Sequence, residues 1–298
     1  MSGASFKKGA LARPLDGEVD LQGHRGARGR RPENTIPAFR YCIDQGMTTI
    51  ELDTNVTKDD QLIVCHDTML NGSICRDERG NAAPPIPIGD LTVAELKLYD
   101  CGSVMNPAFP EQVPVPGTSM PTLPEAFAFA KNYESGRELA RPMRFNIETK
   151  FARDCTAKDI ERSARLVVAA IVDAGMAERA TVQSFVLPVL PIVKRLDSRI
   201  CRSALFESSF IQRSGNEIIL AAREAEAGII SPHVNAVTSA FVEQCHAAGF
   251  RVLVWTVNEE VDMLRLFAWG VDGIISDYPD RLARAYSQRK TDFIETSL

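Results

Sequence analysis

The chain lacks the features that would tie it to a membrane or to nucleic acid. Its 298 residues contain no uninterrupted apolar run near the ~20 residues that a membrane-spanning helix needs. The first 20 residues carry two lysines but no apolar segment. We therefore expect a soluble protein without a signal peptide, and this leaves the cytoplasm and the periplasm both open. Because the net charge is −5 and no long basic run is present, nucleic acid is excluded as a general partner.

Cysteine is too sparse and too scattered for a disulfide framework or a zinc site. The chain has seven cysteines, and no two of them form a C-x-x-C motif. We expect most of them to be buried thiols, as free cysteines usually are. One bridge remains open, and Cys65 with Cys75, beside a predicted hairpin, is the candidate pair.

A G-x-G-x-x-G motif after the first strand is also missing, which disfavours an open nucleotide-binding sheet. What the chain does contain is a regular alternation of Val- and Ile-rich segments with helical patterns. The predicted strands cover residues 19–24, 48–56, 144–150, 180–185, 202–206, 227–233, 251–257 and 271–277. Repeated strand–helix units imply a parallel sheet, and eight of them indicate a closed (β/α)₈ barrel, the TIM-barrel form of the α/β class. We predict one domain over residues 1–298, with its core at about 20–285.

Residues 68–120 interrupt this alternation with a segment rich in proline and glycine. Residues 62–67 just before it are interpreted as a hairpin extension of the second strand. Thr92 with Glu95, and Thr122 with Glu125, have the spacing of capping boxes and predict two helix starts. Because loops that follow barrel strands lie at the C-terminal mouth, we expect this insertion to lie over any active site.

Carboxylates gather at the predicted strand ends. Glu51 and Asp53 stand two residues apart and so share one face of the second strand, as Glu148 and Lys150 do on the next barrel strand. An all-oxygen set suits Mg²⁺ or Ca²⁺, and like charges so close together are costly without a cation. The alternative is that these carboxylates only pair with Lys150 or an arginine. A third carboxylate on the same side favours the cation site.

Histidine is scarce, with four residues, and three of them lie at the ends of predicted strands. His24 and His66 are expected at the mouth, beside the cation site and the positively charged groups described next. Two histidines in such a place are typical of an acid–base pair. His233 ends the sixth predicted strand and is a weaker candidate for lining the mouth. His246 lies in an amphipathic segment, and we interpret it as an ordinary helix residue.

Positive charge lies next to these groups. Arg25 follows His24 directly, and its planar guanidinium suits the oxygens of a phosphate, to which Lys150 would add charge. The glycines at 23, 26 and 29 are expected to let the backbone approach a ligand. Three further arginines, Arg28, Arg30 and Arg31, are interpreted as a solvated surface, with attraction of anionic substrates as the alternative. Asn258 is expected to cap the helix that follows it.

Taken in order, these motifs resemble those of the glycerophosphodiester phosphodiesterase family over about residues 20–282. The motifs are HRG (24–26), PENT (32–35), ELD (51–53), HD (66–67), NIETK (146–150), SF (184–185), VWTVN (254–258) and DGIISDYP (272–279). The resemblance implies a TIM barrel with a small insertion after the second strand. It also implies hydrolysis of a small-molecule glycerophosphodiester, such as glycerophosphocholine or glycerophosphoethanolamine, to sn-glycerol 3-phosphate and an alcohol.

The resemblance also implies roles for individual residues. Glu51, Asp53 and Glu148 match the ligands of one divalent cation, Ca²⁺ or Mg²⁺. His24 and His66 match the catalytic pair, and Arg25 and Lys150 match the groups that hold the phosphate. Phe185 and Trp255 are interpreted either as an apolar wall for the glycerol carbons or a choline group, or as ordinary barrel packing.

Two other functions stay open at this point. A phospholipase D-like activity on lysophospholipids or sphingolipids would need a groove for an acyl chain, and the proline-rich insertion favours shorter, deacylated substrates. A non-catalytic barrel that binds phosphoesters would not need His24, His66 or three clustered carboxylates. The identity of the cation, the alcohol group and the oligomeric state are not determined by the sequence.

Overall fold

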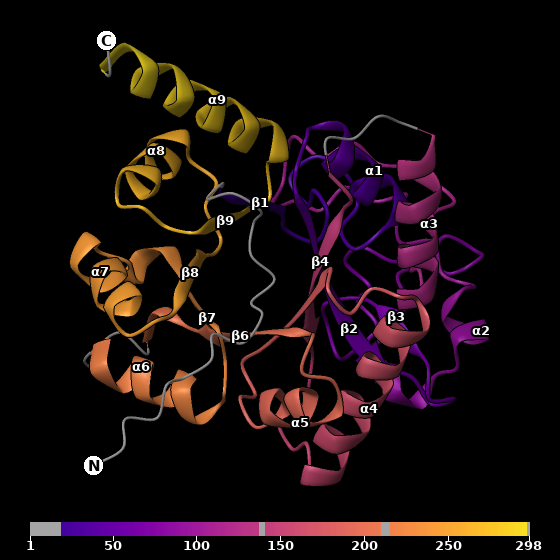
Figure 1. Ribbon diagram of the computed structural model, residues 1–298. Helices are drawn as coiled ribbons and strands as arrows, with labels where there is room; N and C mark the ends of the chain where they lie inside the picture. Colours follow the sequence, from indigo (N-terminus) through magenta and orange to yellow (C-terminus); the bar gives the residue numbers. More distant parts are fainter. Residues whose placement is uncertain (1–18, 137–140, 210–214, 297–298) are drawn as a thin grey trace.

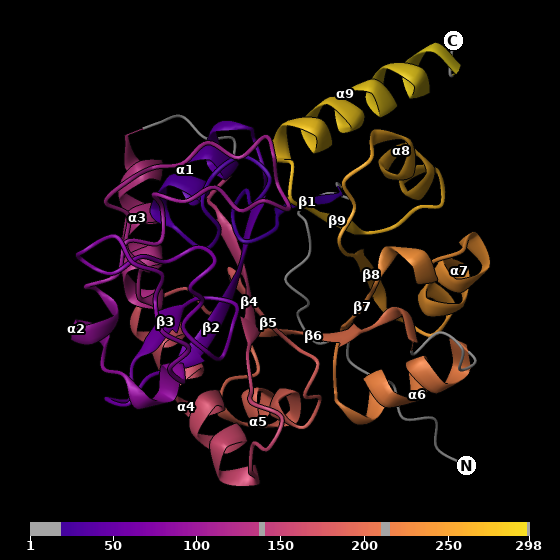
Figure 2. The same cartoon turned by 180° about the vertical axis from the view of Figure 1, so that it is seen from behind.

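The computed structural model describes residues 19–136, 141–209 and 215–296, so the prediction for the N-terminal 18 residues lies outside it. Eight strands form a closed parallel barrel (Figures 1 and 2): β1 (Asp20–Gly23), β2 (Thr49–Val56), β4 (Arg144–Thr149), β5 (Ala180–Ser184), β6 (Cys201–Phe206), β7 (Ile229–Pro232), β8 (Arg251–Val254) and β9 (Gly273–Ser276). The ring closes because β1 pairs in parallel with both β2 and β9. Each strand overlaps its predicted segment, with bounds that differ by at most three residues, and the predicted TIM barrel is confirmed.

Helices surround the barrel in the order expected of strand–helix units (Figure 1): α1 (Ile36–Asp44), α3 (Leu123–Ser135), α4 (Ala157–Asp173), α5 (Val189–Leu196), α6 (Gly215–Glu224), α7 (Ser239–Ala247), α8 (Glu260–Ala268) and α9 (Pro279–Thr296). The predicted capping box of Thr122 and Glu125 begins α3, with both reciprocal hydrogen bonds present. In the part of the chain described here, no helix is long and apolar enough to cross a bilayer.

The alternation of side chains along each strand separates an apolar outer layer from a polar interior. On β2, Ile50 and Leu52 are fully buried in the core that the strands share with the helices. Glu51 and Asp53 lie on the opposite face of the same strand, which is the barrel interior. The result is that carboxylates on neighbouring strands point into one enclosed volume.

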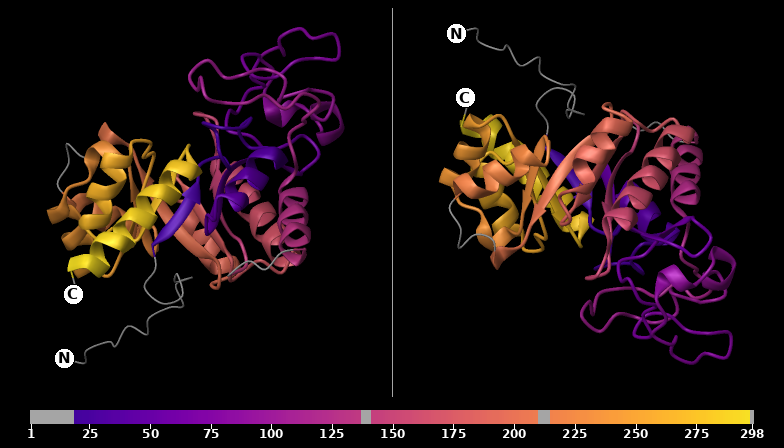
Figure 3. Two further views of the ribbon diagram at one scale, coloured as in Figure 1. Left: turned by 90° about the horizontal axis from the view of Figure 1, so that it is seen from above. Right: turned by 90° about the horizontal axis from the view of Figure 1, so that it is seen from below.

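The insertion folds around a core of its own. The hairpin prediction is confirmed, because β3 (Leu62–Val64) pairs antiparallel with β2. The short helix α2 (Val93–Leu96) begins at the predicted capping box of Thr92 and Glu95. Apolar side chains of the hairpin and the insertion pack together: Ile63, Leu70, Cys75, Ala83, Ile88, Leu96, Cys101 and Met120. Figure 3 shows the insertion projecting beside β2 and α3, on the side of the barrel away from α6, α7 and α8.

A disulfide joins Cys75 to Cys101, so the predicted Cys65–Cys75 bridge is wrong and Cys65 is a free thiol. The reason is an antiparallel bridge between Arg76 and Asp100, because this register places residues 75 and 101 opposite each other. No local spacing in the sequence reveals that register.

Candidate active site

One pocket lies at the C-terminal ends of the barrel strands, and we call it the mouth pocket. Its lining residues are His24, Arg25, Arg28, Glu51, His66, Glu148, Lys150, Gln183, Phe185, Leu205, Glu207, Trp255, Thr256 and Ile275. Eight of the nine predicted site residues are among them, and the ninth, Asp53, lies beside Glu51 and Glu148. None of the described lining residues comes from the insertion. It meets the rim instead, where the Phe109 ring lies 4.5 Å from the Arg28 guanidinium.

Glu51, Asp53 and Glu148 form an acidic cluster in the barrel interior. Each offers a carboxylate oxygen, and these oxygens all lie within 4.8 Å of one another. The Nζ atom of Lys150 lies 2.6 Å from Oε1 of Glu148 and 3.7 Å from Oδ1 of Asp53. The Nε atom of Arg25 lies 3.4 Å from Oδ2 of Asp53. Asp53 and Glu148 therefore do form ion pairs with Lys150 and Arg25, as the alternative interpretation expected. Two cationic side chains cannot neutralise three carboxylates.

The donor set of the acidic cluster fits a divalent cation. Oδ1 of Asp53 is buried and has no hydrogen-bond partner among the described residues. Among the described residues, the two oxygens of Glu51 accept hydrogen bonds from neutral donors alone, at 2.8 Å each, from the Arg25 backbone N–H and the Gln183 amide. Three carboxylates thus face two cationic side chains, and an all-oxygen site with excess negative charge is what hard cations such as Mg²⁺ and Ca²⁺ prefer.

The electrostatics of the acidic cluster show the same excess of negative charge. Burial and the charge of Asp53 raise the pKa of Glu51 well above its usual value. The same two causes raise the pKa of Glu148 from 4.5 to about 7. Burial also opposes ionisation of Asp53, but the charges of Arg25 and Lys150 hold its pKa below the usual value. Without a cation, Glu51 and Glu148 therefore tend to bind protons, which reduces the negative charge of the acidic cluster.

A cation should therefore stabilise the protein more at high pH than at low pH. The folded, cation-free state binds extra protons at Glu51 and Glu148, so its stability falls as pH rises above 4.5, and the contribution of Glu148 is lost at about pH 7. A cation bound at these carboxylates would replace those protons. We expect the rise in Tm caused by Mg²⁺ or Ca²⁺ to be larger by about 4 °C at about pH 8 than at about pH 5.5. Thermal melts with and without EDTA measure this, and equal shifts at both pH values would contradict it.

His24 is held by a carboxylate that the sequence analysis did not select. Its Nδ1 atom lies 2.7 Å from Oδ1 of Asp277, which directly follows β9. Asp277 is 1% exposed and also accepts hydrogen bonds from the Arg28 guanidinium, at 2.9 and 3.1 Å, and from the Asn258 amide, at 2.8 Å. The prediction that Asn258 caps α8 is therefore wrong: Asn258 anchors Asp277, and the residue at the N-cap position is Glu259, whose side chain makes no capping hydrogen bond. The position of Asp277 at a strand end was the signal available in the sequence.

The contacts of His24 fix its tautomer. A carboxylate can only accept, so Asp277 binds the protonated Nδ1, and Nε2 is left 3.9 Å from Oε2 of Glu51. Burial lowers the pKa of His24 to about 4, although the charge of Asp277 opposes this. The result is a neutral imidazole whose Nε2 carries a lone pair at the mouth pocket.

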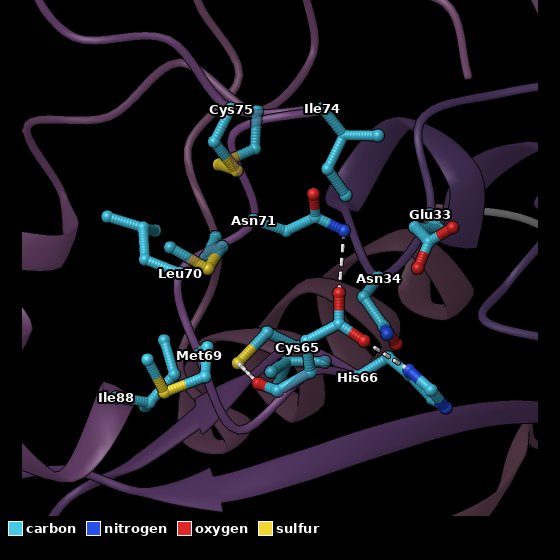
Figure 4. Close-up of a pocket in the computed structure, with 14 residues that line it drawn as sticks. Glu33, Asn34, Cys65, His66, Met69, Leu70, Asn71, Ile74, Cys75 and Ile88 are labelled. Atoms are coloured by element: carbon cyan, nitrogen blue, oxygen red, sulfur yellow. Dashed lines mark hydrogen bonds and ion pairs between the residues drawn. A yellow bond between two sulfur atoms is a disulfide. The ribbon is translucent and has the colours of Figure 1, made fainter. Parts of the chain in front are cut away.

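His66 is oriented by the residue that follows it, Asp67, which is held in turn by Asn71 of the insertion. Its Nδ1 atom lies 2.8 Å from Oδ1 of Asp67, whose Oδ2 accepts from the Asn71 amide at 2.6 Å (Figure 4). A second pocket, which Figure 4 shows, lies between barrel and insertion; its lining residues are Glu33, Asn34, Val64, Cys65, His66, Asp67, Met69, Leu70, Asn71, Ile74, Cys75, Ile88, Cys101 and Met120. His66 lines both pockets and therefore lies between them.

The loop after β1 carries Arg25 in a strained conformation. Arg25 has a φ of 49°, a left-handed backbone that turns its N–H toward Glu51, and its guanidinium lies 2.6 Å from Oε1 of Glu33. The expectation that glycines here admit a ligand is wrong. A Cβ on Gly23 would lie 2.0 Å from the Gly26 carbonyl oxygen, and one on Gly29 would meet the Tyr278 ring at 2.4 Å. The glycines are needed because the loop packs against the protein itself.

The interpretation of Arg28, Arg30 and Arg31 as a solvated surface is also wrong. Arg28 lines the mouth pocket, and the side chains of Arg28 and Arg30 are each 18% exposed. Arg30 pairs with Asp280, while Arg31 donates to the Arg30 carbonyl and stacks on the Tyr41 ring. Acidic partners distant in the sequence hold Arg28 and Arg30 against the barrel, and a nearby aromatic ring holds Arg31.

Two aromatic rings form one side of the mouth pocket. Phe185 and Trp255 meet edge to face with ring centroids 5.4 Å apart, and the Trp255 indole donates to the Ser231 carbonyl at 2.9 Å. The His233 ring packs edge to face against Trp255 at 5.1 Å and is not among the described residues that line the pocket, so His233 supports this wall without forming it. His246 lies on α7 and pairs with Asp272, as expected of a helix residue outside the site.

Comparison with known proteins agrees with these features. The sequence pattern of the "Glycerophosphoryl diester phosphodiesterase family" matches residues 24–281. A glycerophosphodiester phosphodiesterase of Caldanaerobacter subterraneus subsp. tengcongensis is 30% identical over 259 residues, which are 87% of this chain and 94% of that protein. Lysophospholipase D GDPD1 of Mus musculus is 24% identical over 282 residues, 87% of this chain and 83% of that protein.

Solved structures show the same barrel. A Silicibacter pomeroyi protein assigned as a glycerophosphoryl diester phosphodiesterase superimposes with a TM-score of 0.84 at 26% identity, over 94% of this chain and 96% of that one. A phosphodiesterase of Oleispira antarctica, in complex with the product sn-glycerol-3-phosphate, superimposes with a TM-score of 0.73 at 24% identity, over 90% of this chain and 96% of that one. The predicted family is thus confirmed: this chain belongs to the glycerophosphoryl diester phosphodiesterase family of hydrolases.

Proposed function

We propose that the chain hydrolyses deacylated glycerophosphodiesters, such as glycerophosphocholine and glycerophosphoethanolamine, to sn-glycerol 3-phosphate and an alcohol. The observation that supports this most directly is the meeting of an acidic cluster and two carboxylate-bound histidines at one pocket. We assign Glu51, Asp53 and Glu148 as ligands of one divalent cation. When bound, it supplies Lewis-acid charge to the phosphoryl oxygens.

The two histidines exchange protons in the proposed reaction. The 2-hydroxyl oxygen of glycerol forms a bond to phosphorus and gives its proton to one histidine. The bond from phosphorus to the alcohol oxygen breaks as the other histidine donates a proton to that oxygen. Water then opens the cyclic phosphate with proton transfers in the reverse direction, which returns both histidines to their starting states. The fixed Nδ1–H of His24 leaves its Nε2 available for this exchange.

Arg25 and Lys150 are assigned to the phosphate in this scheme. In the structure Lys150 is paired with Glu148, so its ammonium partly neutralises the acidic cluster. With the acidic cluster loaded, the Lys150 ammonium would no longer be needed by Glu148 and would be free to hold a phosphate oxygen. Phe185 and Trp255 would pack against the glycerol carbons or the alcohol group. The complex of the similar Oleispira antarctica phosphodiesterase with sn-glycerol-3-phosphate supports this class of product.

The proposal is tested by assaying release of sn-glycerol 3-phosphate from a panel of glycerophosphodiesters. The purified protein is supplied with Mg²⁺ or Ca²⁺, and matched samples contain EDTA. We expect release with at least one diester and one cation, and its loss with EDTA. Absence of product from every diester with both cations would contradict the proposal. Full activity in EDTA would contradict the role proposed for the cation but not the proposed hydrolysis.

Lysophospholipids are the second substrate class to include, because a relative that is 24% identical is named lysophospholipase D. An acyl chain needs an apolar path out of the mouth pocket, and Phe185 and Trp255 offer one such surface. Equal kcat/KM on lysophosphatidylcholine and glycerophosphocholine would favour this alternative. We expect the deacylated diester to be preferred, since the insertion does not line the pocket.

A further inference from the structure

A continuous chain of hydrogen-bonded amides runs through the barrel interior to the acidic cluster. Its members Gln22, Asn146 and Gln183, from β1, β4 and β5, are at most 2% exposed. Nδ2 of Asn146 donates to Oε1 of Gln22 and to Oε1 of Gln183, at 2.9 Å each. Nε2 of Gln22 donates to Asp20 at 2.9 Å, and Nε2 of Gln183 donates to Glu51 at 2.8 Å. This row of hydrogen-bonded amides therefore ends at a carboxylate on each side, Asp20 and Glu51.

The two carboxylates fix the direction of every amide between them. Glu51 must be ionised to bind a cation, and an ionised carboxylate only accepts hydrogen bonds, so in that state each glutamine turns its nitrogen toward the carboxylate and its oxygen toward Asn146. Asp20 is held in this role by the hydroxyls of Thr48 and Thr49, which donate to it at 2.7 and 2.6 Å. Asn146, which lies between the two glutamines, must then donate a hydrogen bond to each of their side-chain oxygens. Among side chains of this size only an amide nitrogen can do so.

The unused atom of Asn146 supports the same conclusion. Its Oδ1 is buried and has no hydrogen-bond partner among the described residues, whereas both N–H groups are used. A buried acceptor without a partner is costly, so the donors are what this position requires. Aspartate has nearly the same shape but offers oxygens only, so it would satisfy the packing and not the hydrogen bonds.

We infer that Asn146 is a positioning residue for the cation site and acts through Gln183. By accepting at Oε1, Gln183 is forced to present its N–H to Glu51, which holds that carboxylate in one orientation and leaves its remaining lone pairs for a cation. Asn146 itself is not among the described residues that line the mouth pocket. The inference rests on the proposed assignment of Glu51 as a cation ligand. It adds that cation affinity also depends on Asn146, which contacts Gln183 and not Glu51 itself.

The test compares two variants of Asn146 in their affinity for Mg²⁺ and Ca²⁺, measured by isothermal titration calorimetry without substrate. Asn146→Asp reverses both hydrogen bonds and turns the Gln183 oxygen toward Glu51, so we expect affinity to fall by about 100-fold. Asn146→Ala removes the donors but leaves Gln183 free, and we expect a fall of about 10-fold. A residue that served only packing would give the opposite order, because aspartate fills the space of asparagine and alanine does not.

Two further variants keep the result interpretable if Asn146→Asp does not fold. Gln183→Met keeps the volume and removes the N–H, and an unchanged affinity would overturn the inference. Ser203→Ala is the matched control, because Ser203 is paired in register with Gln183 and its buried hydroxyl has no partner among the described residues. We expect it to bind like wild type. If wild type binds neither cation, the proposed cation site fails together with this inference; if it binds and Asn146→Asp binds equally, only the inference fails.

Discussion

His24→Ala and His66→Ala are each expected to retain less than about one-hundredth of the wild-type kcat on glycerophosphocholine. A positioned acid or base contributes about 10²–10⁴-fold to a rate, and each histidine is proposed to move one proton in each step. KM and cation affinity should change far less than kcat, since neither histidine is assigned to the cation. Steady-state kinetics combined with calorimetric cation titration separates the two effects.

A matched control for these variants exists in the same chain. His246 also pairs with an aspartate, Asp272, at 2.8 Å, but it lies on α7 outside the mouth pocket. His246→Ala should therefore keep the wild-type kcat. If His24→Ala or His66→Ala kept more than about one-tenth of kcat, that histidine would not be a proton carrier in the rate-limiting step.

Asp277→Asn is expected to lower kcat by about 10³-fold while the barrel remains folded. In the serine-protease triad, replacing the orienting aspartate by asparagine lowers kcat about 10⁴-fold because the imidazole takes the wrong tautomer. The same argument applies to His24, whose Nδ1–H is fixed by Oδ1 of Asp277 at 2.7 Å. An amide in that place can donate to Nδ1 and move the proton to Nε2. The lone pair that the mouth pocket needs is then lost.

Asp272→Asn is the control for this second variant, because it alters the corresponding histidine–aspartate pair on α7. It should leave kcat unchanged. Proton-detected NMR of the imidazole nitrogens gives a readout independent of activity, since the tautomer of His24 should change in Asp277→Asn only. A low kcat without a change of tautomer would mean that Asp277 acts through Arg28 or Asn258 instead.

Much of the barrel and of the candidate site could be predicted because the information is local. Strands and helices follow from apolar periodicity, and the capping boxes at Thr92 and Thr122 follow from a spacing of three residues. Glu51 with Asp53 share a face because side chains alternate along a strand. Closure of the barrel then brings them beside Glu148, since β2 and β4 are neighbours with Asp53 opposite Glu148 in the register.

The contacts that were missed are those between distant positions. His24 and Asp277 are separated by 253 positions in sequence, and only the pairing of β1 with β9 brings them together. The burial of Arg28 depends on the same contact. The Cys75–Cys101 disulfide depends on an antiparallel register within the insertion that leaves no periodic signal. In each case the sequence contains both partners but not the geometry that selects them.

The sequence by itself determined the family, the closed barrel and the residues that carry charge at its mouth. Those conclusions need only residue types, their order and the periodicity of strands and helices. The tertiary structure alone decided which groups orient those residues: Asp277 behind His24, Asp67 and Asn71 behind His66, and the amides of Asn146 and Gln183 behind Glu51. Hydrogen bonds act over about 3 Å and depend on direction, so they are fixed only when the fold sets both distance and angle.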